Sequence, residues 1–177
     1  MLVATLTDPP SFCRQRTDPS IRRSTVSNPQ LVNAFTSIVA AITEGKLDDL
    51  DPLIRYDIVD HNLILGQGDG LPGIKYWART MRTAIPDLTA AIHDTVSEAN
   101  KIAARVHWAG TQTGALLGTP PTHSYLEFES FYILHFSDGM AVEWRDVSDT
   151  RDALRSLHRR ARLLEARNSL DQSAAGY

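Results

Sequence analysis

The sequence predicts a single α+β domain: helices come first, a run of antiparallel strands follows, and a last helix closes the chain. The first half carries apolar residues at helical spacing, as in Leu31, Phe35, Ile38 and Ile42. In the second half the period changes to two, and apolar side chains alternate with others along residues 102–109. Helices and strands segregated in this way favour α+β over a βαβ parallel sheet. A strongly curved sheet with helices across its concave face leaves a pocket between the two layers.

Start and stop signals bound the predicted helices. Asn28 is suited to cap a helix, and Pro29 fits the first helical position, where its missing N–H costs nothing. Gly45 supplies the stop for this helix, and Pro86 ends a later helix predicted over residues 73–85. Two shorter elements are expected between them: a helix over residues 48–54 and an extended segment over residues 56–62.

The second half of the chain predicts four strands and a helix. Turn residues separate the strands at 98–100, in a proline-containing loop at 117–122, and at Ser137-Asp138-Gly139. The strands are expected at residues 88–97, 102–114, 125–136 and 140–147, and the last helix at about residues 149–166.

The composition is typical of a globular domain without bulk affinity for nucleic acid or membranes. Of 177 residues, 42% are apolar and 22% charged, and the net charge is −3. No apolar stretch approaches the roughly 20 residues that span a bilayer. The single cysteine, Cys13, excludes an internal disulfide, so we expect a cytoplasmic protein. We expect residues 1–28 to form a flexible leader, residues 29–166 the domain, and residues 167–177 a flexible tail.

Several motifs occur in a fixed order along residues 31–157: Asp60-His61-Asn62, Ile85-Pro86-Asp87-Leu88, the strand segment 105–114, Gly118-Thr119-Pro120-Pro121-Thr122, Phe136-Ser137-Asp138-Gly139 and the closing segment 143–149. This series resembles the SnoaL-like polyketide cyclases, within the larger nuclear-transport-factor-2-like group of α+β cones. The resemblance implies a cone-shaped pocket under a curved antiparallel sheet. The same cone hosts cyclases, isomerases, epoxide hydrolases and non-catalytic binding modules. The resemblance is therefore more specific for the fold than for the function.

The resemblance also implies a catalytic aspartate. Ring-closing members perform an intramolecular aldol condensation with an aspartate on the last strand as acid and base, and the matching position is Asp146. Such enzymes use no metal and no cofactor, because the carbonyls of the substrate delocalise the carbanion. Trp144 stands where some members have a histidine, so the hydrogen bonds around the substrate must differ.

The residues themselves support Asp146 independently of the resemblance. Strand alternation places it on the same face as Trp144, beside large apolar side chains. A carboxyl group facing an apolar pocket loses hydration, which raises its pKa and makes it a better base near neutral pH. The alternative is a strand-end aspartate that caps the last helix or pairs with Arg145 or Arg151, although Asp149 is the better cap candidate.

Other polar and aromatic residues are candidates for substrate contact. His61, the second catalytic candidate, follows an extended segment that would reach the pocket mouth, where imidazole could shuttle a proton; the alternative is a polar residue that satisfies loop backbone groups. Tyr132 shares strand parity with Phe128 and Leu134 and is expected to point inward, as a ligand contact or as plain core. The expected substrate-binding set is Asn62, Trp108, Ser130, Tyr132 and Trp144.

The histidine spacing bears on metal binding, and the apolar residues of one strand bear on self-association. The histidines at 93, 107, 123 and 135 form no pair with a recognised ligand spacing, so no metal site is expected. Phe131 and Ile133 have the opposite parity to Tyr132, and an outward apolar face of this kind predicts a homodimer.

The sequence thus favours a cofactor-free acid–base enzyme of polyketide-like small-molecule biosynthesis, a cyclase or an isomerase. Two alternatives stay open. One is epoxide opening by Asp146 with His61, although the inward Asp–Arg–Asp set of limonene-epoxide-type members is not found. The other is a protein that binds a small molecule without transforming it.

Overall fold

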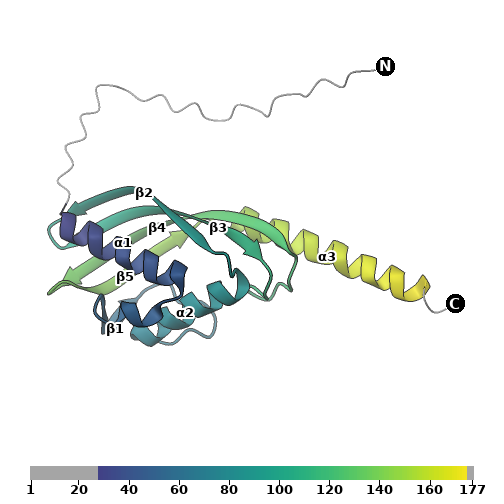
Figure 1. Cartoon of the computed structure of the whole chain (residues 1–177), viewed down its shortest axis with the longest axis horizontal. Coiled ribbons are helices and arrows are strands. Elements are labelled where there is room, and N and C mark those ends of the chain that lie inside the picture. The colour runs from purple at the N-terminus through teal and green to yellow at the C-terminus, as the bar shows by residue number, and fades with distance from the viewer. Residues whose placement is uncertain (1–27, 175–177) are drawn as a thin grey trace, which may run out of the picture.

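Figure 1 shows the computed structural model, which describes the backbone of residues 28–174 and the side chains as far as Arg167. The expected leader up to residue 27, with Cys13, and residues 175–177 of the expected tail lie outside this range. The first helix, α1 (Pro29–Glu44), has the predicted bounds. Asn28 caps it, because its side-chain oxygen accepts a hydrogen bond from the Gln30 N–H at 3.1 Å. Gly45 ends it in the left-handed conformation at φ 74°.

The remaining elements follow the predicted order with shifted bounds. The expected second helix is only a 3₁₀ turn, η1, and the last helix continues to Ala174 instead of ending near residue 166. The elements after α1 are η1 (Leu47–Leu50), β1 (Ile54–Asp60), α2 (Gly70–Ala84), β2 (Thr89–Glu98), β3 (Lys101–Gln112), β4 (Ser124–Ser137), β5 (Met140–Ser148) and α3 (Arg151–Ala174).

Helix α2 begins at Gly70, three residues before the expected start at Gly73, and a steric constraint requires glycine at this first position. Gly70 has φ 69°, and a Cβ at this position would lie 2.5 Å from the Tyr56 carbonyl oxygen. The loop and β1 therefore approach each other too closely for any other residue. Pro72 sits in the first turn, where a missing N–H costs nothing.

The five strands form one sheet in the order β1-β5-β4-β3-β2. Strands β2 to β5 pair antiparallel, as predicted, but β1 runs parallel to β5. The chain leaves β1 through α2 and re-enters the sheet at its opposite edge as β2. Figure 1 shows α1 and α2 against one face of the curved sheet, while α3 extends away from it. The predicted α+β fold class is confirmed.

The core lies between the helices and the concave face of the sheet. Phe35 and Ile38 of α1 are fully buried together with Ile102 of β3 and Leu134 of β4. The opposite face is open: Phe131 is 55% exposed. The strand parity predicted for β4 therefore holds, with even-numbered residues inward and odd-numbered ones outward.

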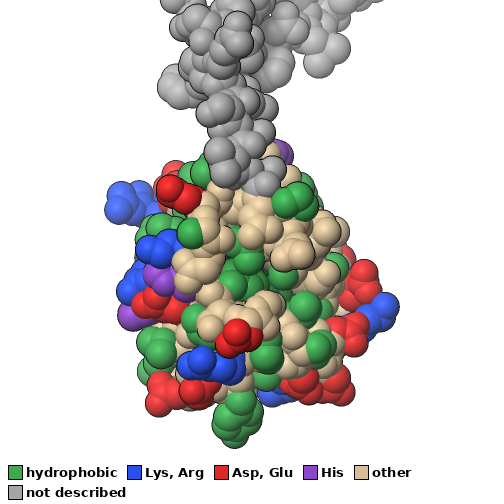
Figure 2. Space-filling view, turned by 90° about the vertical axis from the view of Figure 1, so that its left-hand side faces the viewer, with side chains coloured by type: hydrophobic (Ala, Val, Ile, Leu, Met, Phe, Trp, Pro, Cys, Tyr) green, Lys and Arg blue, Asp and Glu red, His purple; other side chains and the backbone are tan. Residues whose placement is uncertain are grey.

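Charges of both signs are mixed on the surface. Figure 2 looks at the end of the molecule where α1 begins, and there acidic, basic and apolar side chains are interspersed, in keeping with the small net charge of −3. Among the described residues, no helix combines the length and apolar character needed to cross a bilayer.

Candidate functional site

A cavity of about 200 Å³ lies between α2, the concave face of the sheet and the start of α3. Its walls are mainly apolar and aromatic, with Trp77 from α2, Phe128 and Tyr132 from β4, and Trp144 from β5. Two carboxylates also line it, Asp60 at the end of β1 and Asp146 near the end of β5. An apolar cavity with a few convergent polar groups is the usual form of a small-molecule site.

Asp146 is the carboxyl group of the cavity whose pKa is clearly shifted. Its carboxylate accepts hydrogen bonds from the Trp144 Nε1–H at 3.2 Å and from the Ser148 hydroxyl at 3.4 Å. Burial raises the pKa of Asp146 above its usual value, the Trp144 and Ser148 hydrogen bonds oppose that rise, and the negative charge of Asp60 adds to it. The outcome is a raised pKa, which makes the carboxylate a stronger base than an exposed aspartate.

A row of donors reaches Asp146 from the core. The Trp108 Nε1–H donates to the Tyr132 hydroxyl at 3.1 Å, the Tyr132 hydroxyl bonds Ser130, and Ser130 Oγ lies 2.7 Å from Ser148 Oγ. If each group donates to the next one, every hydrogen in the row has an acceptor. The order of donation is then from Trp108 to Tyr132, Ser130, Ser148 and finally Asp146. Burial raises the pKa of Tyr132, so this hydroxyl keeps its proton and is able to donate it to Ser130. The row is a buried polar network that ends on the carboxylate.

The loop after β1 forms the other polar wall. Asp60 accepts from the Asn62 backbone N–H at 3.0 Å and from Gln67 Nε2 at 2.7 Å. Asn62 Oδ1 in turn accepts from the Asp146 backbone N–H at 3.3 Å. Asn62 lines the cavity, and its side-chain amide also carries two N–H donors on Nδ2. Asp60 therefore fixes the loop and contributes negative charge near Asp146.

The geometry agrees with the comparison to known proteins. A family model for the SnoaL-like polyketide cyclases matches residues 32–157, which is most of the chain. The protein belongs to this family. The resemblance inferred from the motifs is thus confirmed, and family membership supports a polyketide-cyclase type of function. No curated protein sequence matches the chain.

Several solved structures have the same fold. TsrD from Streptomyces laurentii is 24% identical with a TM-score of 0.66, over 77% of this chain and 97% of that one. IdmH from Streptomyces antibioticus, proposed to be a polyketide cyclase, is 25% identical with a TM-score of 0.64, over 72% and 97%. AclR from Streptomyces galilaeus, proposed to be a hydroxylase, is 24% identical with a TM-score of 0.65, over 75% and 87%.

Four of the predicted site residues of this SnoaL-like protein line the cavity together: Asn62, Tyr132, Trp144 and Asp146. Trp108 and Ser130 do not line it. They lie behind the wall, buried: Trp108 contacts the lining residues Tyr132 and Trp77, and Ser130 contacts the lining residue Ser148.

His61 lies elsewhere. Its Nε2 bonds Glu143 Oε1 at 2.8 Å, on the outer side of the sheet. Hydrogen bonds from Arg145 and His61 hold the pKa of Glu143 below its usual value. The expectation that His61 reaches the pocket mouth is therefore wrong, because its neighbour Asp60 takes the inward position and adjacent residues of an extended segment point to opposite sides.

Sequence reasoning missed several cavity residues. Ser148 has the parity of Asp146 and could have been found from it, and Asp60 stands in the same motif as His61. Gln67 carried no signal, because its position depends on the course of the loop. Further lining residues that were missed include Trp77, Thr80, Met81, Leu116 and Leu126. Among the described residues, one group could hold a metal ion. It consists of His93, His107 and Glu129 and lies outside the cavity, on the outer face of the sheet.

Proposed function

We propose that this protein is a cofactor-free acid–base enzyme that closes a ring or isomerises a bond in a polyketide-like substrate. The observation that carries the proposal is the Asp146 carboxylate, set in an aromatic cavity with its pKa raised by burial. Its side-chain partners, Trp144 and Ser148, are neutral donors and leave its charge uncompensated. An arginine or lysine partner would instead lower the pKa and make the carboxylate a weaker base.

The chemistry begins with proton transfer from carbon. Asp146 takes a proton from a carbon between two carbonyl groups, and the electron pair of that C–H bond delocalises onto the carbonyl oxygens as an enolate. In ring closure, the enolate carbon attacks a second carbonyl carbon of the same molecule and forms a C–C bond. The protonated Asp146 then returns its proton to the new alkoxide, so that the step conserves all atoms and electrons.

The chain supplies donors and walls for this reaction. We assign the Asn62 Nδ2 hydrogens to bind the enolate oxygen, because Asn62 lines the cavity and its Oδ1 already accepts from the Asp146 backbone N–H. The Tyr132 hydroxyl is engaged by Trp108 and Ser130, so we assign its ring, with Trp77 and Trp144, to shape the cavity. Aromatic walls exclude water and orient a flat substrate.

Isomerisation shares the first step. If no second carbonyl lies within reach of the enolate carbon, Asp146 returns the proton to a different carbon and a double bond moves. The choice between the two outcomes then belongs to the substrate and to the length of the cavity.

Deuterium exchange tests the proposed base directly. Aromatic 1,3-diketones and linear triketones are incubated with the protein in D₂O, and the carbon between the carbonyls is followed by NMR and mass spectrometry. We expect exchange above the buffer rate, and a loss of about 10²–10⁴-fold in Asp146→Asn. His61→Gln is the matched control, because that side chain lies outside the cavity, and it should keep the exchange rate. Equal exchange by wild type and Asp146→Asn would overturn the proposal.

Two other functions are less well supported. Epoxide opening of the limonene-epoxide type needs an arginine between two aspartates, and the cavity lining contains Asp60 and Asp146 but no arginine. Incorporation of ¹⁸O from labelled water into an epoxide-derived product would favour that reaction. Binding without turnover would leave a diketone unexchanged while Asp146→Ala changed only its affinity.

We also propose that the protein acts in the cytoplasm, in secondary metabolism, as a homodimer that uses the outer face of the sheet. Phe131 and Ile133 of β4 and Val147 of β5 are 55%, 47% and 71% exposed and adjoin one another across the two strands. Burying them against a second copy removes apolar area from water. Sedimentation at micromolar concentration should give a dimer, and Phe131→Glu should give a monomer; a monomeric wild type would contradict this.

A further inference from the structure

Two histidines and a glutamate meet on the outer face of the sheet, on the side away from the cavity. His93, His107 and Glu129 come from β2, β3 and β4, and one possible ligand atom from each lies within 4.8 Å of the other two. The rings of His93 and His107 have centroids 5.9 Å apart and an interplanar angle of 80°. Because the three residues lie on separate strands, no spacing along the sequence could indicate them.

An irregularity in β2 creates the group. The register of β2 against β3 shifts between Ile92 and Asp94, and both His93 and Asp94 are exposed while Ile92 is half-buried. Consecutive residues of a regular strand point to opposite faces, so a bulge is needed to turn both outward. Asp94 can then bond Arg105 at 2.9 Å while His93 stays beside His107.

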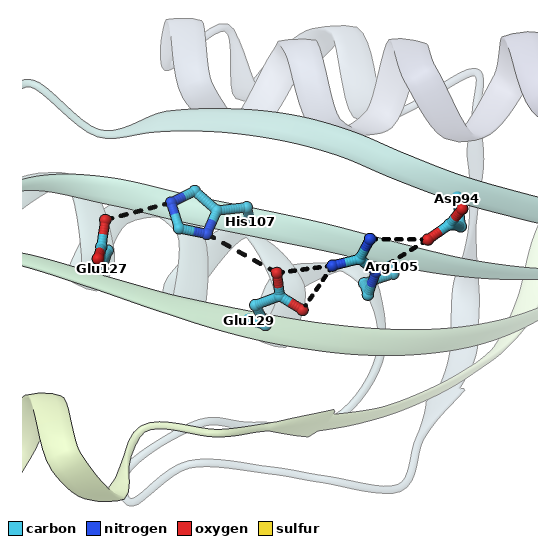
Figure 3. Close-up of polar contacts among 5 residues, drawn as sticks. All are labelled: Asp94, Arg105, His107, Glu127 and Glu129. Carbon is cyan, nitrogen blue, oxygen red and sulfur yellow. Dashed lines mark hydrogen bonds and ion pairs between the residues drawn. The ribbon is translucent and has the colours of Figure 1, made fainter. Parts of the chain in front are cut away.

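A neighbouring carboxylate orients His107. Its Nε2 lies 3.6 Å from Glu127 Oε2, while its Nδ1 faces Glu129 Oε1 at 4.0 Å (Figure 3). With its proton on Nε2, facing Glu127, His107 would present the lone pair of Nδ1 toward Glu129. Metal-binding histidines are commonly held in this way by a carboxylate on the other ring nitrogen.

Arg105 holds Glu129 without using all of its acceptor capacity. The Arg105 Nη1 donates to the two oxygens of Glu129 at 2.8 and 3.0 Å, and its Nε donates to Asp94. A carboxylate offers about four lone-pair sites, so Glu129 can accept Arg105 and a cation together. Asp94 offsets the guanidinium charge near the site (Figure 3).

We propose that His93, His107 and Glu129 form a surface site for a divalent transition-metal ion such as Zn²⁺. Two imidazoles and one carboxylate are a donor set that suits zinc, nickel and copper. Ligand atoms around a tetrahedral zinc ion stand about 3.3 Å apart, so modest side-chain rotation closes the group. The ion joins edge strand β2 to β3 and β4, and water fills the fourth position.

The test is a zinc titration of the full chain without a polyhistidine tag. We expect calorimetry to give one ion per chain, and long-range ¹H–¹⁵N spectra to show zinc-dependent shifts at the His93 and His107 rings. His93→Ala/His107→Ala should lose saturable binding, and His93→Gln, an exposed and less disruptive change, should weaken it. Glu127→Gln, which removes a negative charge beside His107, should weaken binding about tenfold or more.

His158→Ala is the matched control, because His158 is an exposed histidine on α3 away from the group, and it should bind zinc as the wild type does. Circular dichroism of each variant without metal checks the fold. Undiminished zinc binding by the double variant, imidazole shifts confined to other histidines, or no saturable binding by the wild type at millimolar zinc would each overturn the proposal.

Discussion

Replacing Tyr132 by phenylalanine removes one hydroxyl and leaves a buried donor without an acceptor. The Trp108 Nε1–H, on a side chain that is 1% exposed, bonds that hydroxyl at 3.1 Å. The phenylalanine ring fits the same space, so the packing of Trp144 against it at 5.5 Å between centroids is retained. The substitution therefore removes a hydrogen-bond acceptor from the Trp108 Nε1–H and changes the packed volume little.

The expected cost follows from this geometry. Leaving one buried polar group unsatisfied destabilises a protein by about 1–3 kcal/mol. For a chain of this size each kcal/mol lowers Tm by roughly 2–4 °C, so Tyr132→Phe should melt about 2–12 °C below wild type. Thermal and urea denaturation followed by circular dichroism measure the change.

A double-mutant cycle separates the hydrogen bond from other effects. Trp108→Phe removes the donor as well as some volume, so the double variant should be less destabilised than the sum of the single variants, by about 0.5–3 kcal/mol. A Tyr132→Phe variant as stable as wild type would refute the reasoning. So would single changes that add within about 0.3–0.5 kcal/mol, since they would show that the two groups are not coupled.

Three further changes test the site and the fold. Asp146→Asn should stabilise the protein at neutral pH. Because the pKa of Asp146 is higher in the folded protein than in the unfolded chain, the wild type loses stability as the pH rises from the unfolded pKa through the folded pKa. The urea midpoints of the variant and the wild type should therefore converge only below about pH 4. Ser148→Ala removes a hydrogen bond that lowers the pKa of Asp146, so the acid limb of the deuterium-exchange profile should move to higher pH; an unmoved limb would contradict the assignment. Gly70→Ala should destabilise by about 1–3 kcal/mol, because it meets the Tyr56 carbonyl at positive φ, whereas Gly68→Ala, with open space around it, should be close to neutral in the same melts.

Strand parity explains which parts of the site the sequence could predict. Tyr132, Trp144 and Asp146 lie on β4 and β5, where alternation is regular around them, and counting by two places each on the cavity side. Helix α1 was predictable because Asn28, Pro29 and Gly45 mark its ends with local chemistry. In these segments short-range rules decide the outcome.

Parity fails where the register changes or the chain leaves a strand. The pairing of β1 with β5 shifts between Ile54 and Val59, and only that long-range register decides that Asp60 turns inward and His61 outward. The direction of the His93 side chain likewise depends on a register shift, the bulge in the pairing of β2 with β3. The contact of Gln67 with Asp60 depends on a loop path, for which the sequence contains no periodic signal.

The opposing influences on Asp146 suggest why the site takes this form. Burial and the charge of Asp60 favour the protonated carboxyl, while Trp144 and Ser148 favour the carboxylate. Burial alone would favour the protonated carboxyl, which cannot accept a proton, whereas stronger donors would lower the pKa and make the carboxylate a weaker base. The donor row from Trp108 through Tyr132 and Ser130 orients the Ser148 hydroxyl, so Trp108 and Ser130, which do not line the cavity, help to set this balance. Changes in that row should therefore alter the pH dependence of proton transfer more than substrate affinity.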